Sequence, residues 1–115
     1  MPVTSVGLNN ILTLWAADLT HLGVGSGATD PALSDTALGA ELDRNGLTLE
    51  TLTGNQYIAE TFFGTAEANG TIREVALFDA AAAGNMDYRG QPSAPQSKTS
   101  TKQLRVTITF TLSNA

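Results

Sequence analysis

The chain has 115 residues, of which 42% are hydrophobic, and it carries a formal net charge of −5 and no cysteine. This length supports one domain with a modest core, and the lack of cysteine excludes disulfides and thiolate metal sites. An acidic chain without a Lys/Arg cluster is a poor partner for nucleic acid or an anionic membrane surface. No apolar run reaches the roughly 18 residues of a membrane span. The N-terminus lacks the basic region of a signal peptide.

The first 20 residues predict one short helix and the segment that leads from it into a β-domain. Apolar residues recur there at helical spacing: Leu8, Ile11, Leu12, Trp15 and Leu19. Ser5 is the expected N-cap, so we place the helix over about residues 6–14, with a possible extension to Asp18. The apolar stripe is too long to remain in water, so it either covers one end of a β-core or packs against another subunit.

Residues 25–40 are expected to form a long loop rich in Gly, Asp and Pro, reached through a short strand at Leu22 and Val24. Loops of this length in compact domains are usually functional or mobile. The glycines at positions 23, 25 and 27 resemble a phosphate-binding loop only superficially, because their spacing does not fit the dinucleotide motif and no Lys follows them. We interpret them as a sharp backbone turn, and we expect Leu33 and Leu38 to pin the loop to the domain.

Residues 44–112 have the pattern of antiparallel strands. We expect strands near residues 47–50, 57–63, 72–78 and 86–89, with a hairpin turn at Asn69-Gly70, a turn at 80–83 and a loop at 90–97. The clearest strand is the last, residues 104–112, where apolar residues alternate without a break with Arg105 and three threonines. The chain is therefore predicted to be all-β: a compact antiparallel β-sandwich or barrel-like domain over residues 1–115, with one short N-terminal helix.

The chain has few residues suited to catalysis or metal binding. His21 is its only histidine, and no serine stands in a nucleophile-elbow motif. Pairs of acids at 30 and 35, or at 41 and 43, could bind calcium with loop carbonyls, but the EF-hand spacing is absent. We therefore expect no enzymatic activity, no cofactor and no resident metal.

Two features of the charge pattern are expected to be structural. Glu41, Arg44, Arg73 and Glu74 flank apolar positions, and we expect them to form one ion-pair cluster, because an unpaired charge there would be costly. In addition, residues 1–43 carry acids and no bases, whereas residues 88–115 carry bases and no acids. These groups could pair within one subunit, which we favour, or between neighbouring subunits.

The motifs, taken in order, resemble a widespread group of small bacteriophage structural proteins and also part of the phage tail-collar fibre domain. The matching stretches are a G-T-G-like loop at Gly25-Ser26-Gly27, a P-x-x-x-D-T-x-L-x-x-E-x-x-R stretch at 31–44, an I-R-E-x-x-L-F block at 72–78 and the terminal Thr-rich strand. Together they span nearly the whole chain. Two departures are Ala76, where a glycine is usual, and a longer turn at 79–84.

This resemblance implies a virion structural protein that is made in the host cytoplasm. The first expectation is a capsid decoration protein that binds the major capsid protein and stabilises the shell, as an oligomer such as a trimer. The second is a tail, collar or fibre component that binds tail proteins, and the third is a small ligand-binding β-module, for which aromatic residues are scarce. The expected assembly contacts are Leu8, Ile11, Trp15, Gly25, Gly27, Asp30 and Pro31.

Overall fold

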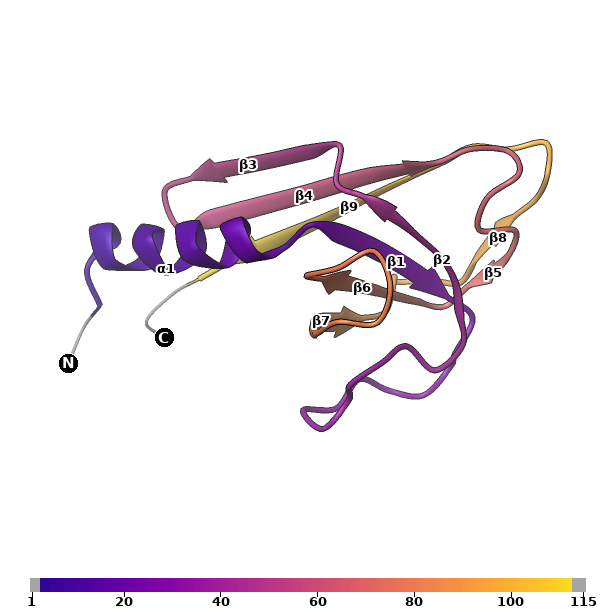
Figure 1. Ribbon diagram of the computed structural model, residues 1–115, viewed down its shortest axis with the longest axis horizontal. Coiled ribbons are helices and arrows are strands. Elements are labelled where there is room, and N and C mark those ends of the chain that lie inside the picture. The colour runs from indigo at the N-terminus through magenta and orange to yellow at the C-terminus, as the bar shows by residue number, and fades with distance from the viewer. Residues whose placement is uncertain (1–2, 113–115) are drawn as a thin grey trace.

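The computed structural model describes residues 3–112 as two packed antiparallel sheets with one helix (Figure 1). The elements are α1 (Ser5–Asp18), β1 (His21–Gly25), β2 (Glu41–Gly46), β3 (Leu49–Thr53), β4 (Gln56–Phe63), β5 (Gly70–Ile72), β6 (Glu74–Phe78), β7 (Met86–Gly90), β8 (Gln96–Lys98) and β9 (Leu104–Thr111). The sheets have the orders β2-β1-β6-β7 and β3-β4-β9, and a small β5-β8 sheet lies at the end opposite α1. The predicted all-β sandwich with one N-terminal helix is confirmed.

The helix α1 begins one residue earlier than expected and has a different cap. The side chain of Thr4, not that of Ser5, accepts a hydrogen bond from the backbone N–H of Gly7 at 3.1 Å. At the other end, the N–H of Leu19 still donates to the carbonyl of Trp15 at 3.1 Å, although the backbone of Leu19 is already extended. The extended residues then lead directly into β1, so α1 and the first sheet are connected without a flexible linker.

One face of α1 covers the β-core. This arrangement is one of the two that the sequence predicted for the apolar stripe, the other being contact with another subunit. The buried face packs on β3 and β4 and consists of Leu8, Leu12 and Ala16. The opposite face also carries apolar side chains that are exposed: Val6, Ile11 and Leu14. The helix therefore has no charged outer surface before its last residue, Asp18.

The core lies between the two sheets. Its largest fully buried side chains are Tyr57 and Phe63 of β4, with Leu22 of β1 and Leu77 of β6. Because successive side chains of a strand point to opposite faces, each strand contributes alternate residues to this layer. On the side where β7 and β9 lie, three rings close the core: Trp15 and Tyr88 each meet Phe110 edge-on, at 4.6 and 4.7 Å between ring centroids.

Three strand assignments differ from the sequence-based expectation. The expected strand at 72–78 is divided at Arg73, whose N–H donates to the carbonyl of Gly25 at 2.8 Å instead of continuing either ladder. β8 lies at the end of the loop expected at 90–97, and β2 begins at Glu41, before residue 44, where the antiparallel strands were expected to start. Neither segment has an alternating apolar pattern. Both are held by pairing, β2 with β1 and β8 with β5.

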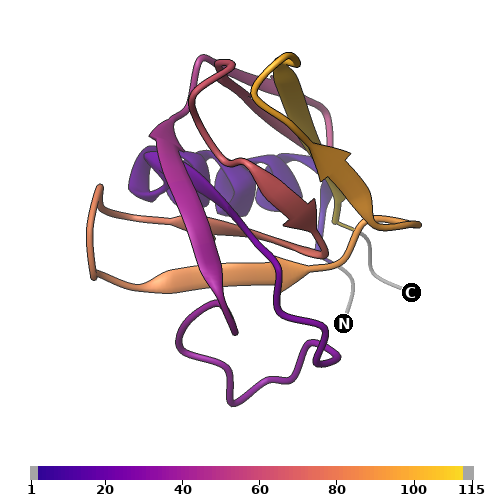
Figure 2. The ribbon, with the colours of Figure 1, turned by 90° about the vertical axis from the view of Figure 1, so that its right-hand side faces the viewer.

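The segment between β1 and β2, residues 26–40, is called here the long loop. In Figure 2, which views the molecule from the end that carries β5 and β8, this loop extends below the two sheets. It begins where β1 ends at Gly25, close to the predicted boundary. Among the described residues, no helix is long and apolar enough to cross a membrane.

Candidate functional site

A buried carboxylate holds both ends of the long loop. Glu74, the first residue of β6, is 0% exposed, and its oxygens face the loop. Oε2 accepts hydrogen bonds from the N–H groups of Gly27 at 2.7 Å and Ala40 at 2.8 Å. Oε1 accepts from the N–H of Gly39 at 2.8 Å and from Nε of Arg89 at 3.0 Å. One side chain therefore binds the start of the loop, its end and the neighbouring strand β7.

The electrostatic balance keeps Glu74 ionised. Burial alone would raise the pKa of this carboxyl, since a charged group loses its hydration. The backbone N–H groups of Ala40, Gly39 and Gly27, followed by the Arg89 guanidinium, outweigh burial, and the pKa lies below its ordinary value. At neutral pH the site is thus an anion surrounded by donors.

Arg89 extends this network from β7 into the middle of the long loop. Its Nη1 donates to Oδ2 of Asp35 at 3.0 Å and its Nη2 donates to the carbonyl of Thr29 at 2.7 Å. The same Oδ2 accepts from the N–H of Ala32 at 2.9 Å. The pKa of Asp35 is lowered first by that backbone hydrogen bond and then by Arg89. A continuous chain of ion pairs therefore runs from Glu74 to the outer part of the loop.

The glycines of the Gly25-Ser26-Gly27 stretch are required by this carboxylate. A Cβ atom on Gly27 would lie 2.5 Å from Oε2 of Glu74 and 2.9 Å from the Cα atom of Gly39. A Cβ atom on Gly25 would also lie 2.5 Å from Oε2. The interpretation of these glycines as a simple turn is therefore incomplete, because their role is to let an anion approach the backbone. The resemblance to a phosphate-binding loop has a physical basis, but the bound anion is the protein's own Glu74.

A second cation ties β2 to the turn between β6 and β7. Arg44 forms a two-pronged ion pair with Glu41, with Nε to Oε2 at 3.1 Å and Nη2 to Oε1 at 2.8 Å. Its Nη1 donates to the carbonyls of Ala80 and Ala83, at 3.1 and 2.9 Å. The guanidinium also lies 3.4 Å from the ring centroid of Phe78. The alanine-rich turn, which was expected at 80–83, is thus held by this arginine.

The four charges predicted to form one cluster are divided between two networks and the surface. Glu41 and Arg44 come together, but Glu74 is paired with Arg89 instead of Arg44. Arg73 is exposed in the break between β5 and β6 and belongs to neither network. The expected single cluster is therefore corrected to two separate networks.

Arg89 and Asp35 were not predicted from the sequence as site residues, although a signal for them was present. Their 3.0 Å ion pair joins an acid of the first third of the chain to a base of the last third. This ion pair is an example of the pairing within one subunit that we expected between the acids of residues 1–43 and the bases of residues 88–115. Lys98, another base of the last third, is buried but bonds to neutral oxygens: Thr65, Asn69 and Thr99.

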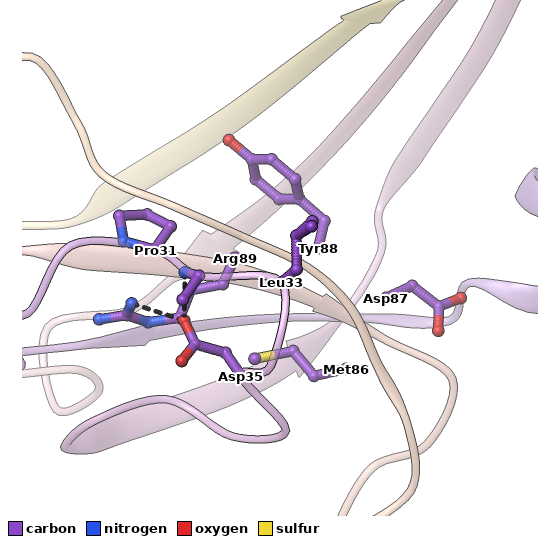
Figure 3. A pocket seen from close by; sticks show the side chains of 8 residues that line it. Pro31, Leu33, Asp35, Met86, Asp87, Tyr88 and Arg89 are labelled. Atoms are coloured by element: carbon purple, nitrogen blue, oxygen red, sulfur yellow. Dashed lines mark hydrogen bonds and ion pairs between the residues drawn. The ribbon is translucent and has the colours of Figure 1, made fainter.

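A groove of about 340 Å³ separates the long loop from β7 (Figure 3). The loop side consists of Pro31, Ala32, Leu33 and Asp35, and the strand side consists of residues 86–89. In the close-up view, Asp35 and Arg89 point toward one another, which neutralises the charged part of the groove. Leu33 is fully exposed and does not pin the loop as expected, whereas Leu38 is buried and does.

The predicted assembly contacts fall into two groups. Those on the surface are Ile11, Asp30 and Pro31. Those buried or half-buried within the subunit are Leu8, Trp15, Gly25 and Gly27. The accessible portion of the predicted contact surface therefore consists of Ile11 on α1 and of the outer part of the long loop, near residues 30–33.

The described residues contain no group of three or more His, Cys, Asp or Glu side chains arranged to hold a metal ion. Comparison with protein-family models and with curated proteins finds no match for this chain. The geometry of the site fixes the conformation of the long loop and leaves Leu33 exposed at its tip.

Proposed function

We propose that this protein is a bacteriophage capsid decoration protein that binds the head shell through its long loop and stabilises it. The observation that carries the proposal is the network of Glu74, which holds the loop from beneath while Leu33 stays fully exposed at its tip. A loop that is ordered before docking loses little conformational entropy when it binds. The order of sequence motifs, which resembles that of small phage structural proteins, supports the same role.

A binding role fits the site better than a catalytic one. The charged groups beneath the loop are engaged with each other and with backbone donors, so none is poised to attack a substrate or transfer a proton. The two charged side chains of the groove beside β7, Asp35 and Arg89, are paired with each other and are not left free to hold a charged substrate. Stabilisation would follow by mass action, because a protein that binds only the assembled lattice shifts the equilibrium toward that lattice.

The proposal is tested with particles that lack the protein, to which purified protein is added back. Wild type is expected to bind over the shell and to raise the temperature at which particles rupture. Leu33→Asp should weaken this binding at least tenfold, about 1.4 kcal/mol, without changing folding, because the side chain contacts solvent. Val6→Asp is the matched control: Val6 is 71% exposed in the first turn of α1, where an acid is tolerated.

The outcomes separate the alternatives that the resemblance leaves open. Binding confined to tails would overturn the decoration role in favour of a tail, collar or fibre component. An unchanged rupture temperature with bound protein would contradict stabilisation. Equal binding by wild type and Leu33→Asp would exclude the long loop as the docking element.

A further inference from the structure

The strand β9 has a free edge, and its position in the fold points to a second copy of this chain as the occupant. It is the outer strand of the β3-β4-β9 sheet, and among residues 3–112 no strand pairs with its other side. We propose that two copies associate antiparallel through β9, which joins two three-stranded sheets into one six-stranded sheet. This inference is independent of the proposed function.

The backbone groups on the free edge can be assigned. The N–H of Leu112 donates to the carbonyl of Asn55 at 2.9 Å, on the side of β4. In an antiparallel pair, alternate residues bond to the same neighbour. Even-numbered residues of β9 therefore face β4, and residues 105, 107, 109 and 111 direct both N–H and C=O away from the sheet. Their side chains are exposed as well, so nothing on these residues obstructs a second strand.

The other outer strands of the two large sheets carry features that discourage pairing, and β9 does not. On β3, the exposed Glu50 lies opposite buried Ala59, on the core-facing side of the sheet, where a second strand would bury its charge. The pairings that hold β2 and β7 each contain a register shift, which twists those edges. In contrast, β9 pairs with β4 over eight residues without a shift, and it contains neither proline nor an acid.

The core is incompletely covered on the same side of the molecule. Phe110 and Tyr88, which belong to the outer strands β9 and β7 of the two sheets, meet edge-on, and Trp15 packs against Phe110 beside them. All three side chains are only half-buried. Aromatic residues are enriched in protein interfaces because they bury large areas at low entropic cost. A second copy on the β9 edge would cover this aromatic cluster.

Full overlap of the two strands places the two-fold axis at Ile108. Thr107 then lies opposite Thr109 of the second copy, and Thr–Thr neighbours across antiparallel strands are favourable. Arg105 lies opposite Thr111 of the second copy, which keeps the two arginines about 20 Å apart by strand geometry. The net charge of −5 does not oppose the contact directly, because β9 carries no acid.

The first test is the mass of the protein in solution at micromolar concentration. Wild type is expected at twice its monomer mass of 12.0 kDa. Thr109→Pro removes an N–H that faces the second copy and leaves the β4 ladder intact, so the dimer dissociation constant should rise at least tenfold. Thr109→Ala keeps that N–H and should remain dimeric. Circular dichroism and thermal melting of the Thr109→Pro monomer check that it is folded.

The second test examines the register and does not depend on proline being tolerated. The double variants Thr107→Lys/Thr109→Lys and Thr107→Glu/Thr109→Glu should each be monomeric, because like charges then face each other across the axis. Mixing them should restore a dimer that contains one copy of each. A monomeric or trimeric wild type, or a Thr109→Pro protein as dimeric as wild type, would overturn the proposal.

Discussion

The buried carboxylate of Glu74 is the part of the structure whose contribution to stability can be worked out most directly. The substitution Glu74→Gln keeps the shape of the side chain but replaces one oxygen with an NH2 group. Oε1 accepts from Gly39 and Arg89, and Oε2 accepts from Gly27 and Ala40. Whichever oxygen is replaced, the new NH2 group therefore faces two donors and can accept from neither.

The size of the effect follows from these unpaired groups. A buried donor without a partner costs about 1–3 kcal/mol, and removing one member of a buried ion pair costs about 3–5 kcal/mol. These costs overlap at Glu74, because Arg89 is both a donor and the ionic partner. We expect the free energy of unfolding to fall by about 3–5 kcal/mol, a large part of the roughly 5–15 kcal/mol that stabilises an ordinary domain.

Urea unfolding at neutral pH measures this difference, and limited proteolysis tests whether the long loop is released. Glu41→Gln is the matched control, since it removes a carboxylate that is paired with an arginine but 35% exposed. This control should cost about 1 kcal/mol or less, as partly exposed ion pairs do. If both variants lose the same stability, and if protease cuts the loop in Glu74→Gln no faster than in wild type, the Glu74 network does not hold the loop.

Two further predictions concern the same network. Because the folded-state pKa of Glu74 lies below its ordinary value of 4.5, its stabilisation is complete above that value and is lost as the pH falls through the folded-state pKa. Urea unfolding across this acidic range should therefore show a smaller loss of stability in Glu74→Gln than in wild type, and equal losses would contradict it. Gly27→Ala should destabilise the protein by about 1–3 kcal/mol, because the added methyl group meets the carboxylate. Gly46→Ala, whose added Cβ has no neighbour nearer than 4.0 Å, should cost clearly less, and thermal melting compares the two.

The sequence predicted those parts of the fold that depend on local pattern. The unbroken alternation of residues 104–112 identified β9, and the helical spacing of Leu8 and Leu12 identified α1. The ion pair between Glu41 and Arg44 could also be predicted from the sequence, because the two residues are three positions apart. The full extent of β2 could not be predicted, since its residues are mostly polar and are held in a strand by pairing with β1.

The centre of the candidate site could be predicted only in part, because it is made by residues far apart in the chain. Glu74 lies 47 residues from Gly27 and 35 from Gly39, so only the folded sheet brings them together. The charges that flank apolar positions marked Glu74 as a site residue, yet the expected cluster placed it with Arg44. Arg89 takes that place because β7 pairs directly with β6, which aligns the two side chains on one face.

The proposed role as a capsid decoration protein is tested most directly by cryo-electron microscopy of particles that contain the protein. The account predicts density for this fold at many equivalent positions over the head shell, with the long loop and Leu33 against the capsid surface. Density confined to the tail, the collar or a single vertex would contradict it.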